Sequence, residues 1–167
     1  TKSAAATKKG IKEFVGSEPA KHVYTDNSRE FERALKDLFF PHDTSTPHRP
    51  ENNGVAERAV RRVKEGSSCS LFQSGLFRDW WAEACICYCF LQNIIDTLED
   101  NTTPYFRRFG LFEGSILPFG VHVEWKPSSP KDKARCPKIG AKTLQGIFLG
   151  YDQKVGGQWN QCVIFAD

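Results

Sequence analysis

The chain of 167 residues contains no methionine and no uninterrupted apolar run long enough to cross a bilayer. A membrane-spanning helix needs roughly 20 consecutive apolar residues. A secretory signal needs an apolar stretch behind its N-terminal lysines, and Thr1–Gly10 is not followed by one. We therefore expect neither a membrane span nor a signal peptide. Because the chain has no initiator methionine, we also expect it to be a fragment of a longer protein.

The cysteines lack the spacing of a metal site. The 6 cysteines form no Cys-x-x-Cys pair, and no closely spaced histidine pair accompanies them. A zinc site is therefore not expected. Cys85, Cys87 and Cys89 alternate within an apolar stretch, where a free cysteine behaves as a small hydrophobic residue. We predict that this stretch is a buried helix.

The composition is that of a folded chain with an uneven distribution of charge. Hydrophobic residues make up 40% of the chain and charged residues 26%, with 13 Phe and 4 Trp, which is enough for a packed core. Basic residues far outnumber the single acid, Asp132, between positions 126 and 142. Such a patch can neutralise phosphates, or it can be a solvated loop kept soluble by its lysines. The basic residues of this patch are Lys126, Lys131, Lys133, Arg135, Lys138 and Lys142.

The first 40 residues predict a helix, a strand and a second helix. Residues 1–16 read as a helix already under way at residue 1 and stopped by Gly16. Lys21–Thr25 is prone to form a strand, and Ser28 is expected to cap a helix that runs through Phe39.

The middle of the chain predicts a loop followed by helices. Residues 43–54 are rich in Pro, Asn, Ser and Thr, which indicates an exposed loop. A helix over 55–65 would carry an apolar stripe wide enough to pack on a core, and Gly66 is expected to interrupt it before a second run to Gln73. A further helix over 79–95 is apolar nearly all round, which predicts deep burial. The stripe consists of Val55, Ala56, Ala59, Val60 and Val63.

The C-terminal third predicts strands instead of helices. Strand-like runs occur at 121–125, 146–151 and 162–165, while Gly and Pro become frequent after Thr103. We therefore expect an α/β part over residues 1–105 and a small β-rich region over residues 106–167.

Two acids suggest chemistry by their context. Asp26 ends a predicted strand, and Glu57 lies on the polar face of the helix after the loop. Carboxylates in such positions can share Mg²⁺ or Mn²⁺, which prefer oxygen ligands and support phosphodiester displacement. The plain alternatives are a helix-start signal at Asp26 and a surface ion pair between Glu57 and Arg61.

The residues around both acids resemble a known family. Thr25–Phe31, Thr-Asp-Asn-Ser-Arg-Glu-Phe, resembles one motif of retroelement integrases, and Ser45–Arg58, which ends Asn-Asn-Gly-Val-Ala-Glu-Arg, resembles a second. Farther along, the chain is similar to signatures of the Ty1/copia branch. These are Trp80–Ala84 (Trp-Trp-Ala-Glu-Ala), Asn93, Thr103–Tyr105 and Gly146–Asp152 (Gly-Ile-Phe-Leu-Gly-Tyr-Asp). The resemblance runs from about residue 10 to residue 152.

The resemblance implies a partial RNase H-like, retroviral-integrase-core fold that lacks its first strands, and a divalent-metal site. Asp26 and Glu57 would be catalytic residues and ligands of Mg²⁺ or Mn²⁺, the second and third acids of a three-acid (DDE) site. The loop before Glu57 would engage DNA ends. Residues implied to contact nucleic acid are His48, Arg49, Asn52, Asn53, Arg58, Arg61, Arg62 and Lys64.

The chain departs from the family pattern at three points. Asp26 and Glu57 are closer in sequence than is usual in the family, and Glu51 stands where a Gln is common. The first acid normally lies on an upstream strand, yet only Glu13 and Glu18 precede Asp26, and both belong to a predicted helix or its following turn. We therefore expect this chain to lack the first catalytic Asp.

Two functions remain open from the sequence. One is an integrase segment for DNA cleavage and strand transfer that is inactive on its own. The other is a transposon remnant that only binds nucleic acid, through residues 58–64 and the patch at 126–142. By resemblance, the partners would be element and target DNA, the remainder of the polyprotein and further copies of the chain. The location would be intracellular, in the nucleus.

Overall fold

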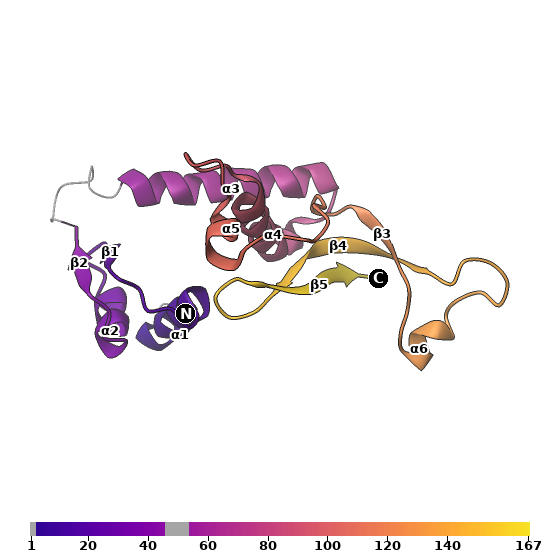
Figure 1. Cartoon of the computed structure of the whole chain (residues 1–167), viewed down its shortest axis with the longest axis horizontal. Helices are drawn as coiled ribbons and strands as arrows, with labels where there is room; N and C mark the ends of the chain where they lie inside the picture. The colour runs from indigo at the N-terminus through magenta and orange to yellow at the C-terminus, as the bar shows by residue number, and fades with distance from the viewer. Residues whose placement is uncertain (1–2, 46–53) are drawn as a thin grey trace. The chain divides into compact units, whose positions relative to one another are not determined.

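The computed structural model describes residues 3–45 and 54–167, and the chain divides into two compact units. The first unit contains residues 1–62 together with residues 153–159, and the second contains residues 63–152 together with residues 160–167. The chain contains both helices and strands in each half of its sequence (Figure 1), so the expected α/β class is confirmed.

The first unit begins with helix α1 (Ala4–Val15). Ser3 caps the helix, because its hydroxyl oxygen accepts a hydrogen bond of 3.2 Å from the backbone N–H of Ala6. Gly16 ends it, with its N–H donating to the carbonyl of Lys12. The expectation that the helix is already under way at residue 1 is therefore wrong, since a cap lies at Ser3.

A strand, a helix and a second strand follow α1. Strand β1 (Val23–Thr25) and strand β2 (His42–Thr44) are parallel neighbours, joined through helix α2 (Arg29–Asp37). The register places Val23 opposite His42 and Thr25 opposite Thr44. The predicted start of the loop at Asp43 is wrong, because Asp43 and Thr44 belong to strand β2. The sequence of β2 has no apolar alternation, and it forms a strand through its backbone pairing with β1.

Helices α1 and α2 pack together over a small core. Ala34 and Leu35 of α2 are fully buried, and Lys8 of α1 lies 3.5 Å from the Asp37 carboxylate. Helix α2 ends at Asp37 and not at Phe39, which has a positive φ of 56° and is 92% exposed. The predicted apolar face of α2 is therefore shorter than expected, because its last aromatic residue points into solvent.

Helix α3 (Gly54–Ser74) is continuous, although an interruption was expected at Gly66. A side chain at Gly66 would come within 2.0 Å of the Tyr88 ring, so the missing side chain makes room for the aromatic ring of another helix. The following serines bond back to the helix, with Ser67 and Ser68 donating to the carbonyls of Val63 and Lys64. The helix thus continues through a segment of low helix propensity, where Tyr88 packs against Gly66.

The predicted apolar stripe of α3 does not pack on a core within the described residues. Val55 is 73% exposed and Val60 is 53% exposed.

Among residues 3–45 and 54–167, no helix is both long and apolar enough to cross a membrane.

The second unit is built around helix α4 (Trp81–Ile95), which follows a short 3-10 turn, η2 (Arg78–Trp80). One face of α4 is buried, through Ala84, Cys87, Phe90 and Ile94. The prediction that α4 is deeply buried is wrong for its other side, however, because Trp81 is 67% exposed and Ile86 is 56% exposed. The buried Cys87 agrees with its predicted role as a small hydrophobic residue, and all six cysteines are free thiols.

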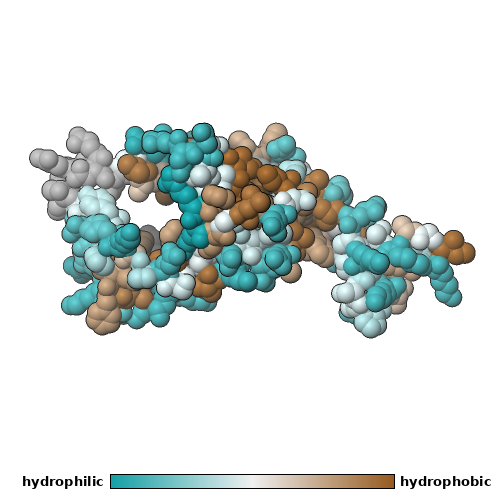
Figure 2. All heavy atoms as spheres, in the orientation of Figure 1, coloured by the Kyte–Doolittle hydropathy of each residue, from teal (hydrophilic) through white to brown (hydrophobic). Residues whose placement is uncertain are grey.

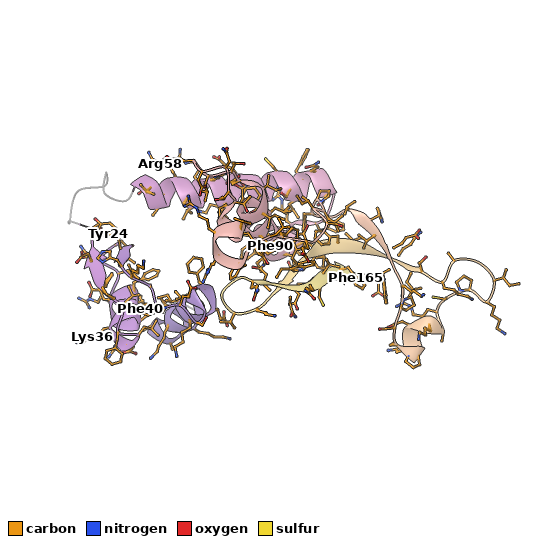
Figure 3. The ribbon with its side chains drawn as sticks, viewed as in Figure 1. Tyr24, Lys36, Phe40, Arg58, Phe90 and Phe165 are labelled. Carbon is orange, nitrogen blue, oxygen red and sulfur yellow. The ribbon has the colours of Figure 1, made fainter. Side chains whose placement is uncertain are left out.

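An aromatic cluster joins α4 to helix α5 (Pro104–Phe109) and to the sheet. The ring of Phe90 lies 5.7 Å from those of Tyr105 and Phe112 and 4.6 Å from that of Tyr151, measured between centroids. Figure 3 shows Phe90 among densely packed side chains, and Figure 2 shows hydrophobic side chains gathered over the same helices. The predicted domain boundary near residue 105 stays a prediction, although residues on both sides of it share this cluster.

A three-stranded sheet completes the second unit. Its order is β3 (His122–Trp125), β4 (Leu144–Gln153) and β5 (Trp159–Ala166), and helix α6 (Pro130–Lys133) lies in the connection between β3 and β4. Strands β3 and β4 are antiparallel, with Trp125 opposite Leu144. The three predicted strands are confirmed, and β4 and β5 extend beyond their predicted bounds.

Candidate metal and nucleic-acid site

Asp26 lies directly after the last residue of β1 and is exposed. The Thr25 hydroxyl lies 2.9 Å from the Asp26 carbonyl oxygen and 2.7 Å from the His42 ring nitrogen Nε2. With the hydroxyl proton donated to the Asp26 carbonyl, His42 Nε2–H donates to the Thr25 oxygen. This chain of contacts holds the backbone of Asp26 while its carboxylate faces solvent.

Ser45 lies at the same edge of the parallel pair, directly after β2. The carboxyl ends of parallel neighbouring strands meet at one edge, and the Ser45 N–H donates to the Thr25 carbonyl at 2.9 Å. The Asn27 side-chain amide donates to the Ser45 carbonyl at 3.2 Å. The segment that leads toward Glu57 therefore begins beside the turn that carries Asp26.

Glu57 lies in the first turn of α3 and is exposed. The cations predicted to share its helix, Arg58, Arg61, Arg62 and Lys64, are exposed as well. Figure 3 labels Arg58 near the start of α3. In the described structure Glu57 makes no ion pair with Arg61, so the alternative of a surface pair between them is not realised.

Four predicted contact residues, His48, Arg49, Asn52 and Asn53, lie outside the described residues. The segment that contains them connects Ser45 to Gly54. The structure describes the residues on both sides of this segment. Ser45 lies beside the turn that carries Asp26, and Gly54 is the first residue of helix α3, which carries Glu57.

The two acids have the donor chemistry of a hard divalent cation. Both are exposed, and neither side chain has a hydrogen-bond or ion-pair partner among the described residues, so their oxygens are available to a ligand. Mg²⁺ in proteins commonly binds through one or two carboxylates and keeps several waters. No group of three or more His, Cys, Asp or Glu residues that could hold a metal is found in the part that the structure describes.

The sequence prediction did not assign roles to Asn27, Ser45 and His42. Asn27 and Ser45 lie within the two quoted motifs, so their membership in these motifs was a signal that could have selected them. No sequence pattern pointed to His42, because its contact with Thr25 depends on the parallel register of β1 and β2.

The chain is similar to parts of retrotransposon polyproteins from plants. It is 34% identical over 137 residues to the retrovirus-related Pol polyprotein from transposon RE1 of Arabidopsis thaliana, covering 77% of this chain and 9% of that protein. It is 35% identical over 152 residues to the Pol polyprotein from transposon TNT 1-94 of Nicotiana tabacum, covering 81% of this chain and 11% of that protein. The chain thus spans about a tenth of the length of these relatives.

No protein-family model matches the chain. Among solved structures, the catalytic core domain of BIV integrase overlaps with 63% of the chain and 70% of its own length, at a TM-score of 0.47 and 23% identity. A chain of the simian T-cell lymphotropic virus intasome, solved with PP2A regulatory subunit B56 gamma, overlaps with 98% of this chain and with 62% of its own length. The TM-score of this overlap is 0.49 and the sequence identity is 16%. Since both TM-scores lie below 0.5, nothing about the site or its partners follows from these overlaps.

Proposed function

We infer that this chain, which is a homologue of the Pol polyproteins of copia-type retrotransposons, is an integrase segment. Residues 1–105 would be the C-terminal part of the catalytic core, and residues 106–167 would be a β-rich region after it. One observation carries the proposal: Asp26 and the start of the segment that leads to Glu57 share one edge of the parallel strands β1 and β2.

Asp26 and Glu57 would be the protein ligands for Mg²⁺ or Mn²⁺ in this segment. When bound, such ions supply a site that activates an attacking oxygen and stabilises a leaving oxygen in phosphodiester displacement. The residues around Asp26 would keep its backbone in place, with His42 and Thr25 on one side and Asn27 on the other. The first acid of the three-acid site would come from a part of the polyprotein outside this chain.

The basic residues of α3 would hold the phosphate backbone of DNA beside Glu57. Arg58, Arg61 and Lys64 are exposed on the helix that carries this acid. Basic side chains position a nucleic acid by binding phosphates without reading its sequence. The proposed partners are element and target DNA, the remainder of the polyprotein and other copies of the chain, in the nucleus.

Metal binding tests the two acids on the chain itself. Calorimetric titration with Mn²⁺ should show weak binding that Asp26→Asn and Glu57→Gln each reduce several-fold. Glu65→Gln is a matched control, because Glu65 is an exposed acid on the same helix as Glu57. Equal Mn²⁺ affinity in all four proteins would remove both acids from the proposed site.

Catalysis is tested in a longer protein that also contains the upstream polyprotein sequence. Strand transfer and nicking of short duplexes with Mn²⁺ should be lost in Asp26→Asn and in Glu57→Gln, and retained in Glu65→Gln. If all versions are equally active, the assignment of the catalytic residues is wrong. If the longer protein binds duplex DNA but none of its versions cuts, the result favours a remnant that only binds nucleic acid.

DNA binding by α3 has its own test. Joint Arg61→Gln and Arg62→Gln substitution should weaken binding to duplexes of any sequence and flatten the dependence of affinity on salt. Removing one cation that neutralises a phosphate reduces the slope of log K against log[salt] by about 0.9. An unchanged slope would contradict the placement of phosphates on this helix.

A further inference from the structure

Cys85 and Cys89 form a pair of thiols on one face of α4. Side chains four residues apart on an α-helix lie one above the other, and each leans toward the N-terminus of the helix. The thiol of Cys89 is accordingly in hydrogen-bond contact with that of Cys85. Both side chains are half-buried, whereas Cys87 belongs to the buried face of the helix. The pair is thus partly shielded from water and still open to a small ion.

The pair offers two sulfur ligands and no more. No group of three or more His, Cys, Asp or Glu residues suited to a metal is found among residues 3–45 and 54–167. Cys69 and Cys162 are exposed, and no other two cysteines of the sequence are spaced four apart. A structural zinc site takes four ligands. Two thiols alone therefore do not complete a zinc site.

The helical spacing favours an ion between the two sulfurs over a direct bond. Side chains at positions i and i+4 of a helix have Cβ atoms about 5–6 Å apart. A disulfide brings its two Cβ atoms to about 3.5–4.5 Å, so Cys85 and Cys89 could form one only if the helix were distorted. Two metal–sulfur bonds of about 2.3 Å separate the sulfurs by about 4.6 Å in a linear arrangement. A bridging ion therefore fits the pair with the helix intact.

The chemistry of the two ligands selects a soft ion of low coordination number. Thiolates suit Cu(I), while Mg²⁺ and Mn²⁺ prefer oxygen ligands. Cu(I) forms stable linear complexes with only two thiolates, whereas Zn²⁺ calls for further ligands. Burial, followed by the neighbouring Cys85 thiol, raises the pKa of Cys89. Cys89 is therefore a neutral thiol at pH 7 until an ion displaces its proton.

We propose that Cys85 and Cys89 form a two-coordinate site for Cu(I). On binding, two S–H bonds break, two Cu–S bonds form and two protons pass to solvent, while no electron is transferred. The site uses neither Asp26 nor Glu57, which offer oxygen ligands to a hard cation. It therefore goes beyond the proposed function and does not depend on it.

Competition for Cu(I) measures the site on the full chain. The chain, with its thiols reduced and oxygen excluded, is titrated into the Cu(I) complex of bicinchoninic acid, whose absorbance falls as copper passes to the protein. The unchanged chain should take up one tightly bound Cu(I) ion. Cys85→Ser and Cys89→Ser should each weaken the affinity by about 10-fold or more, because the second thiolate then no longer binds intramolecularly.

Two controls separate the position of the thiols from their number. The double variant Cys69→Ser with Cys162→Ser removes two exposed cysteines and should keep the affinity for Cu(I). Cys89→Ser combined with Asn93→Cys restores six cysteines, but the new thiol lies two turns from Cys85 on an exposed position. This variant should bind Cu(I) as weakly as Cys89→Ser does. Circular dichroism checks that every variant keeps its helix content.

X-ray absorption at the copper edge should show two sulfur neighbours and no nitrogen or oxygen neighbour. The proposal is overturned if Cys85→Ser binds Cu(I) as tightly as the unchanged chain, or if the variant with Asn93→Cys regains the affinity. Equal losses in Cys85→Ser and in the double variant of Cys69 and Cys162 would also overturn it, since any thiols would then serve. A higher affinity for Zn²⁺ than for Cu(I) would overturn it in favour of a zinc site completed by other residues.

Failure of this site and failure of the integrase site would be seen separately. Cys85→Ser should leave the affinity for Mn²⁺ unchanged, and Asp26→Asn should leave the affinity for Cu(I) unchanged. Uptake of Cu(I) by a chain that binds no Mn²⁺ would support the thiol pair and remove Asp26 and Glu57 from the proposed metal site.

Discussion

The side-chain amide of Asn27 donates a hydrogen bond of 3.2 Å to the backbone carbonyl of Ser45. Asn27 follows the first proposed metal ligand, and Ser45 begins the segment that leads to the second. Ser45 is only 7% exposed, so its carbonyl has limited access to water as a replacement partner. The contact therefore joins the Asp26 turn to the start of that segment.

Asn27→Ala should lower both stability and Mn²⁺ affinity. Loss of one partly buried hydrogen bond costs about 0.5–1.5 kcal/mol in the free energy of unfolding, measurable by urea denaturation. Asn93→Ala on α4 is a suitable control, since Asn93 is exposed and has no partner among the described residues. If Mn²⁺ affinity is the same in the Asn27 and Asn93 variants, Asn27 has a structural role only.

Three glycines should respond differently to replacement by Ala. Gly10 lies in α1 with open space around it, so Gly10→Ala should stabilise the chain by about 0.5–1 kcal/mol. Gly75 has a φ of 70° and also has open space, so only backbone strain of about 1–2 kcal/mol is expected there. Gly120 combines a φ of 78° with a new Cβ only 2.2 Å from that of Ser74, so the destabilisation should be larger still.

Thermal and urea unfolding of these three variants would give their order directly. From the most to the least stable variant, the expected order is Gly10→Ala, Gly75→Ala and Gly120→Ala. A Gly120 variant as stable as the Gly75 variant would show that Ser74 can move away at little cost, contrary to the packing in the second unit.

Cys87 should resist alkylation in the folded chain. Burial raises the pKa of its thiol from 9.0 to about 12, whereas Cys69 and Cys162 are exposed. Iodoacetamide at pH 8, followed by peptide mass spectrometry, should label Cys69 and Cys162 first and Cys87 only after unfolding. Labelling of Cys87 at the rate of Cys69 would contradict its burial.

The same thiol predicts a loss of stability at high pH. The pKa of this thiol is raised in the folded state. Its contribution to the free energy of unfolding is therefore fully present below about pH 9 and is lost as the pH rises toward 12. The slope approaches about 1.4 kcal/mol per pH unit for one proton. Cys87→Ala should have a lower stability at neutral pH and a flatter dependence on pH between 9 and 12.

Asp100 should titrate well below an ordinary aspartate. Hydrogen bonding by the Thr102 hydroxyl, followed by that of Arg107, lowers the pKa of this carboxyl from 3.8 to about 2. Any stabilisation from these contacts is present above about pH 4 and is lost as the pH falls toward 2. In an NMR titration Arg107→Gln should raise the midpoint, and Arg108→Gln should not, because Arg108 lies over the Phe109 ring instead.

The sequence predicted those elements whose signals are local. Gly16 ended a helix, Ser28 preceded one, and the alternating run at 121–125 formed a strand. Strand β2 was missed because a short His-Asp-Thr run becomes a strand only through pairing with β1. The break expected at Gly66 was wrong because Tyr88, far along the chain, occupies the space beside it.

The candidate site was predicted in part for the same reason. Motifs selected Asp26 and Glu57, and the structure has one after a strand and the other in the first turn of a helix. The partners that hold Asp26 were not selected, since His42 reaches Thr25 only in the parallel register. Exposure of Trp81 and Ile86 was not foreseen either, because an apolar sequence does not say which of its faces are covered.

Part of the first unit comes from the turn between β4 and β5, residues 153–159. Within that unit the Gly156 N–H donates to the Glu13 carbonyl of α1 at 2.8 Å, and the Gly16 and Gly156 backbones lie in close contact. During synthesis the ribosome releases α1 long before this turn exists. The first unit therefore cannot be completed when α1 has been synthesised, because one of its segments follows α1 by most of the length of this chain.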